Sequence, residues 1–108
     1  MIKPGATVLD IGCGSGALTS FLVQKAKCTV TAVDINPELV ANAAPYASKT
    51  GAGSIEDIST WEQIDGTFDY IVFADVLEHL ANPDATLQRC KSFLADEGSV
   101  IASIPNIA

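Results

Sequence analysis

The fold is decided by residues 7–16, which read TVLDIGCGSG. The first five, Thr7–Ile11, are mainly apolar or β-branched, which is typical of a strand buried on both faces of a sheet. Three glycines follow at alternate positions. Residues 17–26 then contain no glycine or proline and carry a helical spacing of three and four at Leu18, Phe21, Leu22 and Lys25. A strand, a glycine turn and a helix in this order predict a ligand-binding turn.

The rest of the chain continues to alternate between strands and helices. Strands are expected at Cys28–Val33, Lys49–Ile55, Phe68–Ala74 and Ser99–Ile104. Longer helices are expected from Asn36 to Pro45 and from Asn82 to Gly98, the latter burying Leu87, Cys90 and Leu94, with short helical turns at Ser59–Ile64 and Asp75–Leu80. The third strand should be short and close to a sheet edge, because its glycines disfavour a strand. This alternation predicts an α/β fold, a doubly wound parallel sheet of order 3-2-1-4-5 with helices on both faces.

Composition excludes several classes of function. The chain has 108 residues, enough for one domain, and a net charge of −7 without any basic strip, which argues against nucleic acid as a partner. No apolar run is long enough for a membrane span, and no signal peptide begins the chain, so a cytoplasmic protein is expected. Three widely spaced cysteines and a single histidine disfavour a disulfide framework or a zinc site.

The glycine turn and one later carboxylate point to an adenosine ligand. Gly12, Gly14 and Gly16 allow a ligand to approach the backbone closely, although glycines also serve simply to make a tight turn. Asp34 ends the second expected strand, 20 residues after Gly14, where a carboxylate can accept hydrogen bonds from ribose hydroxyls.

The charge of Asp10 helps to choose among adenosine ligands. A dinucleotide fingerprint is possible with Gly12, Gly14 and Ala17, and it would place pyrophosphate on the following helix. Asp10, however, precedes Gly12 by two residues and brings negative charge close to that position. A ligand with an ammonium or sulfonium group suits this arrangement better than NAD does.

Four segments in chain order resemble class I S-adenosylmethionine-dependent methyltransferases, which have a Rossmann-like fold: Val8–Gly16, Val33–Ile35, Ile55–Asp57 and Phe68–Leu80. The closing residues Ser103–Asn106 resemble the small-molecule, ubiquinone-biosynthesis-like branch. The resemblance covers almost the whole chain and implies S-adenosylmethionine as cofactor and a small-molecule methyl acceptor.

The resemblance also implies roles for individual residues. The loop Gly12, Cys13, Gly14, Ser15, Gly16 would pass under the methionine part of the cofactor, with Asp10 near its ammonium group. Asp34 would bind the ribose and Ile35 would pack on the adenine. Glu56 and Asp57 would border the adenine, one accepting from its exocyclic amine, and the carbonyl of Ala74 would face the ammonium. We do not expect Cys13 to be a nucleophile, because no general base is visible beside it.

Asp75, Glu78 and His79 share one face of an expected helical turn, which makes a metal or acid–base site geometrically possible. In the resembled family this turn is more often a cap over the cofactor cleft, and we expect no metal here. His79 is the candidate for proton transfer, since it is the only imidazole in the chain.

The resemblance finally implies that residues 1–108 are a partial methyltransferase domain, which lacks the antiparallel strands that follow the fifth strand. An unpaired fifth strand could then pair with a second copy, giving a homodimer. Two other functions stay open from the sequence: a non-catalytic module that binds an adenosine ligand and, less favoured, an NAD-binding domain.

Overall fold

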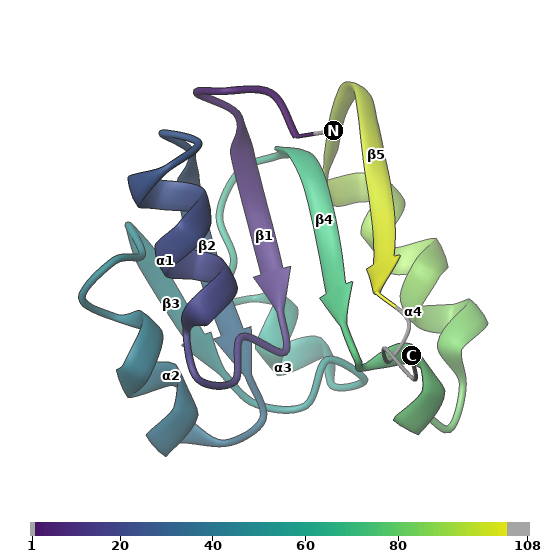
Figure 1. Ribbon diagram of the computed structural model, residues 1–108. Helices are drawn as coiled ribbons and strands as arrows, with labels where there is room; N and C mark the ends of the chain where they lie inside the picture. Colours follow the sequence, from purple (N-terminus) through teal and green to yellow (C-terminus); the bar gives the residue numbers. More distant parts are fainter. Residues whose placement is uncertain (1, 104–108) are drawn as a thin grey trace, which may run out of the picture.

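Five parallel strands form one sheet in the order β3-β2-β1-β4-β5 in the computed structural model, which describes residues 2–103 (Figure 1). Their bounds are β1 Thr7–Ile11, β2 Thr29–Asp34, β3 Lys49–Ala52, β4 Phe68–Ala74 and β5 Leu94–Ser103. The predicted fold class and strand order are therefore confirmed. The expected end of the fifth strand at Ile104, and Pro105 and Asn106 after it, lie outside the described residues.

Helices cover both faces of the sheet. Their bounds are α1 Ala17–Gln24, α2 Pro37–Ala43, α3 Ile58–Trp61 and α4 Pro83–Cys90, with 3-10 turns η1 Leu77–His79 and η2 Lys91–Phe93. One face packs residues of α1 and α2 against β1 and β2, and the other packs α3 and α4 against β1 and β4 (Figure 1). Among residues 2–103 no helix is long and apolar enough to cross a membrane.

Side chains alternate along the central strands between these two layers. Leu9 and Ile11 of β1 join the core beneath α3 and α4, whereas Val8 joins the core beneath α1. All three are almost completely buried. Burial on both faces explains why these strands read as continuous apolar runs.

The first helix turns a different face to the sheet than its apolar spacing predicts. Leu22 is buried and Leu18 partly so, but Phe21 is 58% exposed. Thr19 is completely buried instead, because its hydroxyl donates a hydrogen bond to the Asp10 carboxylate beneath the helix. The buried pair of Thr19 and Asp10 thus helps to orient α1, and Phe21, which shares the helical spacing of Leu18 and Leu22, lies mostly outside the core.

The last helix is also shorter than predicted. It ends at Cys90, and Leu94, which was expected on its buried face, instead begins β5 and pairs with Phe68 of β4. Leu94 still packs against the core. The strand register shifts between Phe68 and Tyr70, and Glu97 has φ 64°, so the chain reverses within residues 94–98 before regular pairing begins at Ser99.

The bounds of β3 and α3 also differ from those predicted. β3 ends at Ala52, three residues before the predicted end, and it lies at a sheet edge as expected from its glycines. The turn predicted at Ser59–Ile64 forms as α3 from Ile58 to Trp61. The Trp61 indole donates to the Ile55 carbonyl at 2.8 Å and so fixes the connection between them.

Candidate functional site

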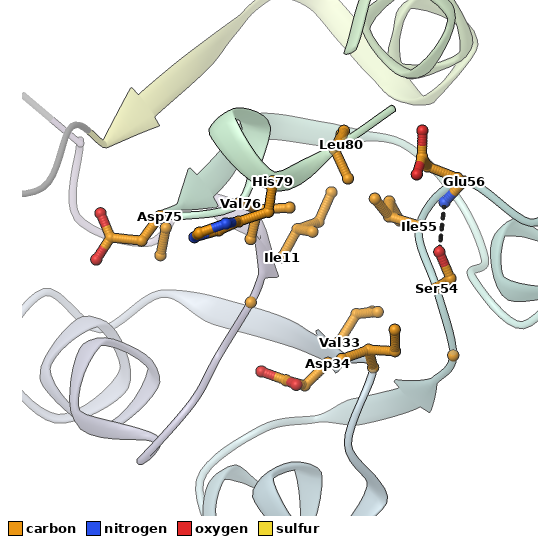
Figure 2. Close-up of a pocket in the computed structure, with 14 residues that line it drawn as sticks. Ile11, Val33, Asp34, Ser54, Ile55, Glu56, Asp75, Val76, His79 and Leu80 are labelled. Carbon is orange, nitrogen blue, oxygen red and sulfur yellow. Dashed lines mark hydrogen bonds between the residues drawn. The ribbon is translucent and has the colours of Figure 1, made fainter. Parts of the chain in front are cut away.

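A cavity of about 400 Å³ opens at the carboxyl ends of the strands. Its walls come from the ends of β1, β2 and β4 and from the loop after β3, so it surrounds the point where strand order reverses between β1 and β4. Ligands of doubly wound sheets bind at this position. Figure 2 shows the lining side chains around the opening.

The glycine loop between β1 and α1 is tightly packed at two of its three glycines. A Cβ on Gly12, which has φ +82°, would lie 2.9 Å from the Ala74 carbonyl oxygen, and one on Gly16 would lie 2.9 Å from the Asn42 carbonyl oxygen. A Cβ on Gly14 would meet almost nothing. Close packing of the turn therefore explains Gly12 and Gly16, whereas the space beside Gly14 is open.

Asp34, at the end of β2, holds the glycine loop directly. One carboxylate oxygen accepts from the Gly14 N–H at 3.0 Å and the other from the Asn36 N–H at 3.0 Å. Asp34 also lines the cavity. Each oxygen keeps a further lone pair for a ligand hydroxyl, so the carboxylate can serve the loop and a ligand together.

Asp10 lies beneath the loop and outside the group of residues that line the cavity. Its side chain is completely buried, and one oxygen accepts from the Thr19 hydroxyl at 2.7 Å. The other oxygen has no hydrogen-bond partner among the described residues. Burial raises the pKa of this carboxyl, and the charge of Asp34 raises it further, against the lowering effect of the Thr19 bond.

Cys13 belongs to the core of the loop. Its side chain packs with Ala32 and Ala43 beneath α2, away from the cavity lining. Burial, followed by the charges of Asp10 and Asp34, raises the pKa of the thiol to about 11. Little thiolate is present at neutral pH, which agrees with a packing role.

The wall after β3 consists of Gly53, Ser54, Ile55 and Glu56, and Asp57 does not line the cavity. The Glu56 carboxylate accepts from the N–H groups of Ala81 and Asn82 at 3.3 and 2.9 Å. Figure 2 shows this carboxylate directed away from the interior of the cavity.

The wall after β4 runs from Ala74 to Leu80. Val76, Leu77 and Leu80 pack onto the core, while His79 and Asp75 lie at the opening, where Figure 2 shows the imidazole extending toward Asp75. The His79 side chain is 76% exposed, and its Nε2 lies 4.0 Å from a Glu78 carboxylate oxygen. No group of three metal-binding side chains occurs among residues 2–103.

Charge and polarity of the cavity favour a cationic, partly apolar ligand. Its lining residues include three acidic ones, Asp34, Glu56 and Asp75, and no lysine or arginine, although the Glu56 carboxylate itself is directed away from the interior. Of the residues predicted to bind the cofactor, the structure gathers five at the cavity, namely Gly12, Asp34, Ile35, Glu56 and Ala74, together with His79, the candidate for proton transfer. It places the others, Asp10, Cys13, Gly14, Gly16 and Asp57, outside the lining.

Sequence reasoning missed the apolar part of the lining, which includes Ile11, Val33, Ile55, Val76 and Leu80. These residues look like ordinary core residues in the sequence. The available signal was their position, since each lies at or just after the carboxyl end of a predicted strand, beside a residue that was chosen for its chemistry.

Comparisons with known proteins agree with this geometry. The family described as "Methyltransferase domain" matches residues 1–108. A ubiquinone biosynthesis O-methyltransferase of Xanthomonas euvesicatoria is 34% identical, in an alignment that covers 94% of this chain and 44% of that protein. A probable (S)-tetrahydroprotoberberine N-methyltransferase 2 of Papaver bracteatum is 35% identical, covering 89% of this chain and 28% of that protein.

A solved structure shows the same arrangement. Coclaurine N-methyltransferase, bound to N-methylheliamine and SAH, matches with a TM-score of 0.78 and 28% identity over 94% of this chain and 31% of its own. The chain belongs to the family of S-adenosylmethionine-dependent methyltransferase domains. It spans less than half the length of the relatives described above.

Proposed function

We propose that this chain binds S-adenosylmethionine in the cavity at the ends of β1, β2 and β4, as the cofactor-binding core of an enzyme that methylates a small molecule. The proposal rests mainly on the acidic lining, with Asp34 at the end of β2 and no lysine or arginine, at the switch point of the sheet. A pyrophosphate would be repelled there, whereas a sulfonium and an ammonium would be attracted. None of the comparisons above supports an NAD-binding domain.

The residues present fit this cofactor. The buried Asp10 carboxylate has an oxygen without a partner among the described residues, and its charge beneath the loop would attract an ammonium group in the cavity; Gly14 leaves open space at the loop. Asp34 has lone pairs for the ribose hydroxyls, and Ile35, which is 70% exposed at the cavity, offers an uncovered apolar face to an adenine ring. The Ala74 carbonyl beside Gly12 would face the ammonium from the opposite strand.

Ser54 and Ile55 are better placed to contact the adenine than Glu56 and Asp57, which were predicted to border it. Ser54 and Ile55 line the cavity, whereas Asp57 does not and the Glu56 carboxylate already accepts two backbone N–H groups. We therefore assign the adenine edge to Ser54 and Ile55.

Bound S-adenosylmethionine supplies a methyl group that its sulfonium has already activated. The chain therefore has to orient the cofactor, hold the acceptor in line and exclude water. The apolar lining provides the water exclusion. His79, exposed at the opening, is the candidate to accept the proton that an attacking hydroxyl or amine releases.

A small organic molecule with an oxygen or nitrogen nucleophile is the proposed acceptor class. The relatives support it, since one is named an O-methyltransferase of ubiquinone biosynthesis and another an N-methyltransferase. The absence of a basic strip in the sequence disfavours a nucleic-acid acceptor.

Calorimetry tests the cofactor assignment, with S-adenosylmethionine, S-adenosylhomocysteine and NAD titrated in parallel into this chain. We expect the first two to bind and NAD not to bind measurably. A radiolabel assay with a panel of phenols, catechols and amines then separates an enzyme from a binding module. Preferential binding of NAD would refute the proposal.

We also propose a weak homodimer through β5, which within residues 2–103 pairs only with β4 and exposes Val100 and Ile101 by 37% and 36%. Light scattering over a concentration series should show association that Ile101→Lys weakens. A monodisperse monomer at all concentrations would refute this dimer without affecting the cofactor site.

A further inference from the structure

Glu56 connects two walls of the cavity that lie far apart in the sequence. The residue belongs to the loop after β3, and its carboxylate accepts from the Ala81 N–H at 3.3 Å and the Asn82 N–H at 2.9 Å, 25 and 26 residues later. We name these two hydrogen bonds the Glu56 bridge. Ala81 directly follows Leu80, which also lines the cavity and lies beside Ile55 in Figure 2.

The loop on the Glu56 side is held firmly. The Glu56 N–H donates to the Ser54 hydroxyl at 3.2 Å, and the Ile55 carbonyl accepts from the Trp61 indole at 2.8 Å. Ile55 itself is buried in the core. A carboxylate carried by this loop is therefore a fixed point to which a neighbouring segment can be attached.

The segment on the other side packs onto the core through Val76, Leu77 and Leu80 but contains little regular structure. Asn82 caps α4 through its side chain, which accepts from the Ala85 N–H at 3.1 Å. Between β4 and α4 the only regular structure is the single 3-10 turn η1. The bridge lies where η1 leads into α4, and a negative charge near the start of a helix is also electrostatically favourable.

We propose that Glu56 is a positioning residue, which fixes His79 and Leu80 over the cofactor cavity by holding the Ala81 and Asn82 backbone. It acts through the bridge and not by contact with adenine. The inference rests on the proposed function only for its effect on the ligand, because the bridge itself is a property of the chain.

Nuclear magnetic resonance on the ligand-free chain tests the bridge. His79 is the only histidine, so its ring signals report on this segment without ambiguity. Glu56→Gln should shift these signals and speed the exchange of the Ala81 and Asn82 amide protons. The matched control, Asp57→Asn, removes the neighbouring exposed carboxylate and should leave both measurements unchanged.

Glu56→Asp provides a second variant in case the first does not fold. It keeps the charge but shortens the side chain by one methylene, so it should lose the bridge and shift the His79 signals as well. Unchanged His79 signals and amide exchange in a folded Glu56 variant would overturn the proposal.

Ligand binding separates positioning from direct contact. S-adenosylhomocysteine and S-inosylhomocysteine differ at the base, where an oxygen replaces the adenine amine. Glu56→Gln should weaken both by the same factor, about tenfold, because loss of the bridge to a charged acceptor would displace the Leu80 part of the cavity wall without touching the base. Selective weakening of the adenosine ligand would show that Glu56 contacts the amine and would overturn the proposal. If the unaltered chain binds neither ligand, the proposed function fails, while the resonance measurements still decide on the bridge.

Discussion

The two sides of the cavity are built in different ways. On the side of β1 and β2, backbone N–H groups hold the Asp34 carboxylate, and the glycine loop packs against neighbouring carbonyl groups. On the side that follows β4, Asp75 and His79 project at the opening, and the 4.0 Å approach of Glu78 to His79 is the only ion pair of this turn. The first side is thus organised before a ligand arrives, and the second presents exposed groups.

This difference suggests a division of labour. A cofactor that is used in every turnover is best met by groups already in place, since ordering them on binding would cost affinity. Exposed, weakly paired groups can adapt to an acceptor. Changes to the first side should therefore alter cofactor affinity strongly, and changes to the second side should alter it little.

Asp34→Ala should have the largest effect. It removes the proposed bonds to two ribose hydroxyls, each worth about 1.5 to 3 kcal/mol when desolvated, so affinity for S-adenosylhomocysteine should fall about 100-fold or more. Calorimetry measures the change. Glu38→Gln, which removes an exposed carboxylate in the first turn of α2, is the matched control and should bind normally. Unchanged affinity in Asp34→Ala would disprove the ribose assignment.

Asp10→Asn, on the same β1 and β2 side of the cavity, should raise stability but lower cofactor affinity. A buried charge costs more than a buried amide, so the variant should gain about 1 to 2 kcal/mol in the free energy of unfolding at neutral pH. The folded state raises the Asp10 pKa above its ordinary 3.8, so ionisation favours the unfolded chain. The gain should therefore be greatest at neutral pH and shrink as the pH falls toward 4.

Urea unfolding at several pH values measures this gain, and the same samples serve for calorimetry. Cofactor affinity should fall in Asp10→Asn, because the charge proposed to face the ammonium is lost. Thr19→Val is a useful companion, since it removes only the hydroxyl that donates to Asp10 and should destabilise the chain. A destabilised Asp10→Asn at neutral pH would show that the carboxylate is better accommodated than its burial implies.

The sequence predicted the side of β1 and β2 more completely than the other side. Strands and glycine turns leave periodic and compositional signals, which pointed to Gly12 and Asp34, and both residues line the cavity. The buried Asp10 and Thr19 pair has no such signal, because a hydrogen bond across a helix and a strand appears only in three dimensions. For this reason the apolar spacing of α1 did not show that Thr19 is buried and Phe21 mainly exposed.

The same limit applies at the loop after β3 and at the last helix. A short acidic motif cannot show whether Glu56 faces a ligand or a distant backbone N–H, since both uses need a carboxylate. Leu94 has a spacing that suits a helix and an apolar character that suits a strand. Pairing with Phe68 decided in favour of the strand.

His79→Gln tests the second side. The imidazole is mainly exposed, so cofactor affinity should change by less than about twofold, the range of ordinary surface substitutions. If His79 accepts the acceptor's proton, the turnover number should fall by about 100-fold once an acceptor is known. Calorimetry and a radiolabel assay on one preparation give both values. A large loss of cofactor affinity would contradict the division between the two sides.

Divalent metal ions should have the smallest effect of all. Asp75, with φ 56°, precedes η1 and does not share the turn that carries Glu78 and His79, contrary to the shared face expected from the sequence, and the described residues contain no group of three metal-binding side chains. A tight site needs its ligands preorganised, which the exposed side of the cavity does not provide. Adding magnesium, manganese or zinc should therefore leave both S-adenosylhomocysteine affinity and the unfolding midpoint unchanged, in the chain itself and in a control carrying Asp75→Asn and Glu78→Gln. A stoichiometric metal that survives dialysis against chelator and is lost in the control would show that the turn after β4 is as well organised as the glycine loop.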